Sequence, residues 1–314
     1  MPPVPRRILL AAPVMLASAA RAQSAWPDRP VRLIVPFPPG GSNDIVTRHL
    51  SEALRERHGQ PFLVENRAGA GANIGADHVA KSPPDGHTLL VAAPGPFAIN
   101  QHLYRTMPFD PARDLVPVAL VAEVPIVLMV PVSSPVTNLA ELIALARRQP
   151  GRLSFGSSSI GGTNHLAGEL LKSMAQVDIV HVPYRGAAPA MTDLIAGRLD
   201  LYFDNMPGVR VIAVAGATRA AVLPDLPTMA EAGLPGFEAS AWFGMAAPGG
   251  APPALVERIN AAVLAALSDP TLRTRFAQAG AEPGRLDAAG FARFVEAERA
   301  KWGGVVRASG ARAD

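Results

Sequence analysis

Three loops in the sequence place small residues at the start of a predicted helix, directly after an apolar, strand-like run. They read PPGGSND at 38–44, SIGGTNH at 159–165 and RGAAPA at 185–190. The first turn of a helix leaves backbone N–H groups unpaired and carries the positive end of the helix dipole. The chemistry that such loops can do is therefore the binding of an anion.

The first loop has two interpretations that its residues alone leave open. In one, the double glycine lets the backbone approach an anion while the serine or asparagine caps the helix. In the other, the glycines only form a tight corner, and the aspartate is favourable in the first turn without any ligand. Neither the P-loop pattern nor a dinucleotide fingerprint is present. The candidate residues here are Phe37, Pro38, Gly40, Gly41, Ser42, Asn43 and Asp44.

The second and third loops add polar side chains. Arg185 stands where a strand ends and a helix begins, and its planar guanidinium suits a carboxylate. A surface arginine is the alternative reading, because the chain has few lysines. The candidate residues of the second loop are Ser157, Ser158, Gly162, Thr163 and His165, and those of the third are Tyr184, Arg185, Gly186 and Ala187.

The sequence supports an enzymatic or a metal-binding site less strongly than an anion-binding site. Ser157 to Ser159 lie close to His165 in sequence, which suggests a serine hydrolase, but no G-x-S-x-G elbow is present. His165 has no orienting partner in sequence, so we interpret it as a hydrogen-bonding or packing residue rather than a base. The seven histidines are scattered without a zinc-binding spacing, so we expect no metal.

The N-terminus has the features of a secretory signal. Arg6 and Arg7 precede a short apolar stretch at 8–19, and Ala-Arg-Ala at 20–22 fits a cleavage site, so we predict a signal peptide over 1–22. Removing it removes three arginines and no acid, which leaves 26 basic and 26 acidic residues. This balance argues against a nucleic-acid partner. With no cysteine, the exported protein cannot use disulfides.

The rest of the chain alternates strands and helices, which predicts two α/β units. The apolar runs 31–37, 61–66 and 88–93 are separated by helices, a pattern typical of a parallel sheet covered on both faces. We assign residues 23–125 and 241–314 to domain 1 and residues 126–240 to domain 2. Extended crossings near 122–126 and 240–244 would form a hinge, and the loops would meet in the cleft between the domains.

Longer blocks of the sequence resemble one family. They include WPDRPVRLIVPFPPGGSNDIVTR, VENRAGAGANIGADHVAKSPPDGHTLLVA, DIVHVPYRGAAPAMTDLIAGRLD, FDNMP, LPDLPTMAEAGLPGFE, WFGMAAP and KWGGVV. In this order they resemble the Bug-type solute receptors of tripartite tricarboxylate transporters, over nearly the whole mature chain. The resemblance implies a type II periplasmic binding protein fold, α/β in class, with two doubly wound domains around a cleft.

The resemblance also implies a function. A periplasmic, monomeric receptor would capture a di- or tricarboxylate, an acidic amino acid or an aromatic acid and deliver it to a membrane permease. The resemblance implies no cofactor. In the family, the loop that matches 37–44 holds a carboxylate, partly through ordered water. Loops that match Ser157–His165 and Tyr184–Ala187 contribute from the second domain, and we add Asp204 of the FDN block. A receptor that only signals, or an exported serine hydrolase, are the alternatives.

Two departures from the family pattern affect the expected site. Where relatives commonly carry Thr-His-Ala, this chain has Pro96-Phe97-Ala98, so we expect an apolar or aromatic part of the ligand near Phe97. Only Met206–Gly208 separates FDN from the run VRVIAV, about nine residues fewer than in relatives. A crossover helix between parallel strands needs a dozen or so residues. Either the local topology differs or the second domain is damaged there.

Overall fold

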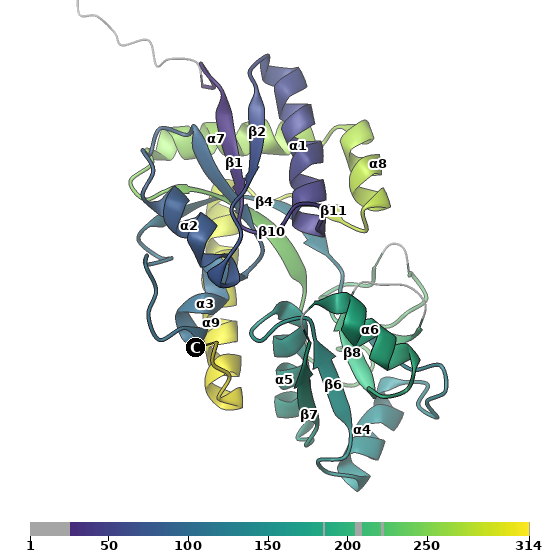
Figure 1. The fold of residues 1–314 in the computed structure, drawn as a ribbon. Coiled ribbons are helices and arrows are strands. Elements are labelled where there is room, and N and C mark those ends of the chain that lie inside the picture. The colour runs from purple at the N-terminus through teal and green to yellow at the C-terminus, as the bar shows by residue number, and fades with distance from the viewer. Residues whose placement is uncertain (1–25, 185, 205–208, 221–222, 314) are drawn as a thin grey trace, which may run out of the picture.

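The computed structural model describes residues 26–184, 186–204, 209–220 and 223–313. The expected signal peptide, Arg185 and the link 206–208 lie outside the described residues. Figure 1 shows two α/β units, one above the other, with strands passing between them. Among the described residues, no helix has the length and apolar character that crossing a membrane requires.

The first unit is built on a sheet whose order is β11-β4-β10-β3-β1-β2. The neighbouring strands β1, β2 and β3 run parallel, as the sequence predicts, whereas β10 runs antiparallel to β3 and β4 and makes the sheet mixed. The strands are β1 Val31–Val35, β2 Phe62–Asn66, β3 Thr88–Ala92, β4 Leu115–Val124, β10 Ala241–Pro248 and β11 Glu282–Pro283.

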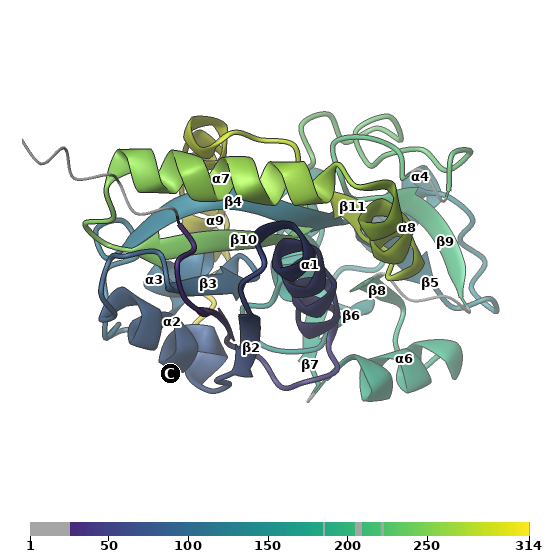
Figure 2. The same ribbon diagram turned by 90° about the horizontal axis from the view of Figure 1, so that it is seen from above.

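Helices cover both faces of this sheet, as Figure 2 shows from above. One face carries α1 Ser42–His58, α7 Pro253–Leu267 and α8 Pro270–Gln278 around a core of hydrophobic side chains. The other face carries α2 Asn73–Ala80, η2 Gly95–Ile99 and α9 Ala288–Ser309, with the short η1 Ala70–Ala72 and α3 Asn100–Leu103 between them.

The second unit has a smaller mixed sheet in the order β7-β6-β8-β5-β9. Its strands are β5 Val127–Val130, β6 Ser154–Ser157, β7 Val180–Pro183, β8 Leu201–Asp204 and β9 Arg210–Val214. The helices α4 Leu139–Arg148 and α5 Thr163–Ala175 contribute to one core cluster, and α6 Ala187–Ile195 contributes to another. Asn138 caps α4 by accepting the Glu141 N–H at 3.0 Å, which is why that helix begins there.

Strand β9 forms in spite of the short connection that precedes it. β8 and β9 lie on opposite sides of β5, and each runs antiparallel to it, so β8 and β9 run in the same direction without pairing. The Arg210 guanidinium fixes the start of β9 by donating to the carbonyls of Ser134 and Val136. The described part of the second sheet therefore remains fully paired around β5.

The two crossings between the units lie side by side. β4 ends at Val124 and β5 begins at Val127, while Ala241 at the start of β10 pairs with Val124. Just before the second crossing, the Ala239 N–H donates to the Ala215 carbonyl of the second unit at 2.8 Å. The division of the chain into two domains at these crossings stays our assignment.

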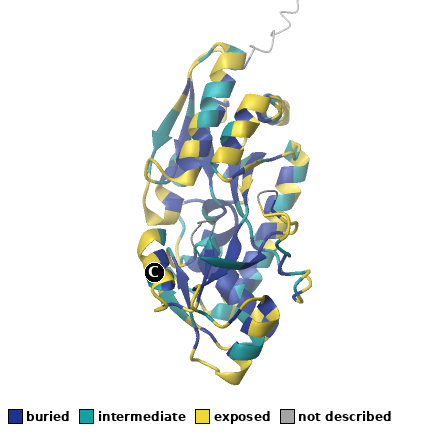
Figure 3. Ribbon diagram, turned by 90° about the vertical axis from the view of Figure 1, so that its right-hand side faces the viewer, coloured by how far each residue is buried: buried dark blue, intermediate teal, exposed yellow. Residues whose placement is uncertain are grey.

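One hydrophobic cluster continues from the first unit into the second behind the crossings, within the buried interior seen in Figure 3. The helix α9 joins the two, because it packs on β4 and η2 and also contacts α5. Glu298 of this helix accepts hydrogen bonds from the indole N–H groups of Trp242, at 2.9 Å, and Trp302, at 2.8 Å. The carboxylate thereby ties the return strand β10 to α9.

Candidate functional site

A cleft of about 920 Å³ lies between the two units and collects loops from both. Its floor is apolar and comes from the crossings, through Val124, Ile126, Ala241 and Phe243. The predicted residues that line it from the first unit are Phe37, Pro38, Gly41, Ser42 and Asn43. Those from the second unit are Ser158, Thr163, Gly186, Ala187 and Asp204.

At the first loop, the N-terminus of α1 has no side-chain cap. The helix begins at Ser42, and its N-cap residue is Gly41, which has no side chain to accept a hydrogen bond. The expectation that Ser42 or Asn43 caps this helix is therefore wrong. Because no side chain of the described residues accepts the first-turn N–H groups of α1, they are available to bind an anion in the cleft.

Asn43 carries the clearest polar signal in the cleft wall. Its side chain is buried, and Nδ2 has no hydrogen-bond partner among the described residues. The Oδ1 atom lies 3.4 Å from the Thr47 hydroxyl, so the amide oxygen faces the helix. A buried donor without a partner costs free energy, which a hydrogen-bond acceptor placed within its reach would recover.

Asp44 supports the loop instead of lining the cleft. Its carboxylate accepts the Gly40 N–H at 2.9 Å, the Arg48 Nε at 2.9 Å and the Asn66 amide at 2.9 Å. Burial opposes ionisation of this group, but the three hydrogen bonds outweigh burial and hold the pKa of Asp44 below its ordinary value. Gly40 does not line the cleft, and its φ of 85° explains why a glycine stands there.

The second loop repeats this construction at the start of α5. The N-cap residue is Gly162, again without a side-chain cap, and His165 accepts the Gly161 N–H at its Nδ1 atom over 2.9 Å. Asn164, which the sequence reading did not single out, lines the cleft and donates to Ser158 Oγ at 2.8 Å. Gly162 and His165 themselves lie behind the cleft wall.

Behind this wall, His165 stacks on His181 with ring centroids 3.8 Å apart. Burial, then the neighbouring His181 and Lys172, lower the pKa of His165 to about 3. Burial and then Lys172 lower the pKa of His181 to about 4. Both imidazoles are therefore neutral at pH 7, and the accepting Nδ1 of His165 places its proton on Nε2.

The arrangement of the serines does not match that of a hydrolase. Ser157 is completely buried and pairs with His181 Nε2 at 2.7 Å, not with His165. Ser158 lines the cleft but accepts from Asn164 instead of facing a base. Among the described residues, no serine that lines the cleft is hydrogen-bonded to a histidine.

The third loop leads into α6, whose N-cap is Gly186, with φ of 111° and no side-chain cap. The Gly186 N–H donates to the Ser158 carbonyl at 2.9 Å, which ties the second and third loops together. Tyr184 does not line the cleft, because its hydroxyl donates to Asp193 at 2.8 Å. Three uncapped helix starts, those of α1, α5 and α6, therefore border one cleft.

The cleft carries little side-chain charge. Within the described part of the chain, Asp204 is the one charged residue that lines it. Burial, the negative charge of Asp204 and a hydrogen bond with it raise the pKa of the neighbouring Tyr202. An anion in this cleft would therefore be held by N–H groups, amides and hydroxyls, with any contribution of Arg185 outside the described residues.

Phe97 corrects one sequence prediction. Its side chain is completely buried and packs against Trp242 and Phe291, with ring centroids 5.4 and 6.2 Å away. The ring lies in the core between η2, β10 and α9 and not in the cleft wall, so the predicted contact with a ligand is wrong. The aromatic rings that line the cleft are Phe37, Phe203 and Phe243.

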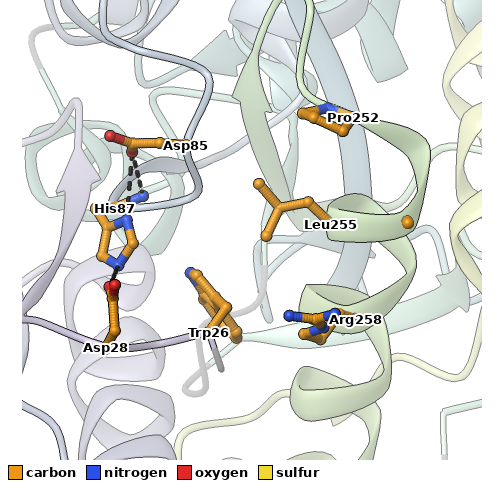
Figure 4. A pocket seen from close by; sticks show the side chains of 8 residues that line it. Trp26, Asp28, Asp85, His87, Pro252, Leu255 and Arg258 are labelled. Atoms are coloured by element: carbon orange, nitrogen blue, oxygen red, sulfur yellow. Dashed lines mark hydrogen bonds and ion pairs between the residues drawn. The ribbon is translucent and has the colours of Figure 1, made fainter. Parts of the chain in front are cut away.

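A separate, smaller pocket of about 220 Å³ lies on the first unit, beside the segments that precede β1 and β3. Figure 4 shows His87 between two carboxylates, with Nε2 3.0 Å from Asp28 and Nδ1 3.3 Å from Asp85. Trp26 fixes the segment before β1 by donating to the Gly86 carbonyl at 3.0 Å. No group of three ligating side chains suited to a metal is found among the described residues.

Two α/β units, two adjacent crossings and a cleft bordered by helix starts define a two-domain solute-binding protein. The profile of the tripartite tricarboxylate transporter family receptor matches residues 46–311. The chain belongs to this family, which includes the Bug proteins and consists of periplasmic solute-binding receptors.

Individual relatives agree with this assignment. Protein BugT of Bordetella pertussis is 37% identical over 320 residues, covering 98% of each chain. The solved structure of Rhodopseudomonas palustris Rpa4515 with adipate is 43% identical, with a TM-score of 0.79 over 91% of this chain and 99% of the other. MatC from the same organism, with bound malate, is 34% identical, with a TM-score of 0.75 over 90% and 100%.

Proposed function

We propose that this protein binds a small organic acid in the cleft between its domains and that carboxylate groups are the recognised feature. The observation that carries the proposal is the convergence of three uncapped helix starts on one cleft. Each presents first-turn N–H groups and a positive dipole end, which favour an anion. At α5 the His165 N–H is an exception, because it donates to Asn164 Oδ1 at 3.0 Å. The unpartnered Nδ2 of Asn43 adds a side-chain donor.

The apolar floor restricts the ligand further. Val124, Ile126 and Phe243 give the base of the cleft no polar side chains, so the body of the ligand between its acidic groups is best apolar. The bound adipate of Rpa4515 has this character, since four methylene groups separate its carboxylates. We therefore expect aliphatic or aromatic acids with an apolar middle to bind more tightly than hydroxylated acids such as malate.

We further propose that the protein is exported, acts as a monomer and delivers its ligand to a membrane permease. The signal sequence expected at 1–22 supports export, and the family supports the transport role. Closure of the domains about the adjacent crossings at Val124 and Ala241 would exclude water from the cleft. Electrostatic attraction between the helix starts and the anion strengthens as water leaves.

Titration calorimetry with the mature protein, residues 23–314, tests the proposal. The panel contains adipate, malate, benzoate and citrate, with the uncharged diamide of adipate as control. We expect at least one acid to bind, and thermal unfolding midpoints to rise with its concentration. Absence of binding by every acid, or equal binding of adipate and its diamide, would reject carboxylate recognition.

A further inference from the structure

The two loops that face each other across the cleft share a five-residue pattern. Residues 40–44 read GGSND and residues 161–165 read GGTNH, so a double glycine, a hydroxyl residue and an asparagine precede a polar fifth residue. The third and fourth positions of both segments line the cleft. In both, the second glycine is the N-cap residue and the helix begins at the hydroxyl residue.

The backbone of the two segments also corresponds. Gly40 and Gly161 have φ of 85° and 75°, in the region that favours glycine. Gly41 and Gly162 have φ of −77° and −66° with ψ of 164° and 161°. The two segments therefore enter their helices by the same path, although they belong to different domains.

The fifth residue closes each segment by the same hydrogen bond. Asp44 Oδ2 accepts the Gly40 N–H and His165 Nδ1 accepts the Gly161 N–H, both over 2.9 Å and both from the residue four positions earlier. Asp44 is 2% exposed and His165 is 4% exposed, so neither acceptor is in contact with bulk water.

Each acceptor is itself fixed by other elements of its domain. Asp44 also accepts from Asn66 at the end of β2 and from Arg48 one turn further along α1. His165 is stacked on His181 of β7 and on Phe155 of β6. The position of each loop is thereby coupled to the sheet behind it.

We propose that Asp44 and His165 are corresponding positioning residues of the ligand site. Each holds the N–H of the first glycine and thereby fixes the helix start whose hydroxyl and asparagine residues line the cleft. The inference rests on the proposed carboxylate binding, because it assigns these two residues to organising the donors on either side of the cleft.

Preorganised donors bind more tightly because the loop does not lose freedom when the ligand arrives. Without its acceptor, the first glycine can leave its conformation, since glycine has many accessible conformations. We expect removal of either acceptor to weaken binding about tenfold or more, as loss of supporting hydrogen bonds does at other organised sites.

The test compares His165→Leu with His165→Asn, because an asparagine side chain has the length of Asp44, which reaches the corresponding glycine. Hydrogen exchange of the Gly161 amide is measured by NMR in the ligand-free protein, and adipate affinity is measured by calorimetry. We expect His165→Leu to exchange Gly161 at least about tenfold faster and to bind about tenfold more weakly. His165→Asn is expected to restore both. His78→Leu, a histidine of α2 that does not line the cleft, is the control and should change neither.

Asp44→Leu and Asp44→Asn give an independent pair if the histidine variants do not fold, with the Gly40 amide as the exchange reporter. Unchanged protection of the glycine in the leucine variant would overturn the proposal. So would a folded asparagine variant that restores neither protection nor affinity. If the wild-type protein binds none of the acids, the proposed function fails, and the exchange measurement alone decides whether the acceptors hold the loops.

Discussion

Substitution of Asn43 should separate an effect on ligand affinity from an effect on the stability of the free protein. Asn43 lines the cleft, and its Nδ2 is buried and has no partner among the described residues, so we expect its hydrogen bond to form only with a ligand. We therefore expect Asn43→Ala to weaken ligand binding while leaving the free protein nearly as stable as before.

The magnitude follows from the charge of the acceptor. A hydrogen bond to a charged group contributes about 1.5 to 3 kcal/mol, which corresponds to roughly a 10- to 100-fold loss of affinity. The free energy of unfolding should change by less than about 1 kcal/mol, because truncation removes a donor that is already unsatisfied in the free protein. Asn43→Asp keeps the volume but places negative oxygens beside the anion, so it should bind more weakly still.

Asn260 provides a matched control because it has the same 5% exposure as Asn43. Its Nδ2 donates to the Val118 carbonyl at 2.8 Å and to the Leu286 carbonyl at 3.3 Å, away from the cleft. We expect Asn260→Ala to lower the free energy of unfolding by about 1 to 3 kcal/mol and to leave affinity unchanged.

Urea unfolding and calorimetry with adipate, or with whichever acid of the panel binds most tightly, measure the two quantities for each variant. The reasoning is refuted if Asn43→Ala binds within about twofold of the wild type. It is also refuted if Asn43→Ala loses as much stability as Asn260→Ala, since Nδ2 would then have a partner in the free protein.

Three further predictions concern other parts of the site. Gly41→Ala should keep its stability, because the added methyl meets only the Pro38 carbonyl, at 3.9 Å, yet should weaken binding by crowding the helix start, which calorimetry checks. Phe97→Ala should lower the free energy of unfolding by about 3 to 5 kcal/mol and leave ligand affinity unchanged. A changed ligand preference in this variant would show that the Phe97 ring contacts the ligand. The lowered pKa values of His165 and His181, about 3 and about 4, mean that the unfolded chain binds protons first as the pH falls below about 6.5. The free energy of unfolding should therefore keep its full value above that pH. Below it, urea titrations from pH 7.5 to 5 should show this free energy falling by up to about 1.4 kcal/mol per pH unit for each histidine. His181→Gln should make this decline shallower, and an unchanged slope would contradict it.

The sequence predicts the loops well because their signal is local. A double glycine between an apolar strand and an amphipathic helix indicates a helix start, and the hydroxyl and amide residues next to Gly41 line the cleft. Asn164 could have been found by the same signal, because it follows Thr163 as Asn43 follows Ser42.

The direction in which a side chain points is less predictable, because it depends on distant segments. Phe97 turns into the core because Trp242 and Phe291, contributed by β10 and α9, surround it there. His165 pairs its ring with His181 of a neighbouring strand, which no local pattern indicates. The antiparallel strand β10 that makes the first sheet mixed is likewise the return of the chain from the second unit.

Because two tryptophans donate to Glu298, movement at the hinge can be followed by tryptophan fluorescence. The sequence contains three tryptophans, and two of them, Trp242 and Trp302, donate to this one side chain. Trp242 stands between Ala241 and Phe243, both of which line the cleft, so movement of β10 on closure would change the surroundings of its indole. Unlabelled protein therefore carries a built-in fluorophore at the hinge, and a Trp302→Phe variant would leave Trp242 as its main emitter there. Stopped-flow emission could then separate ligand capture from domain closure in time.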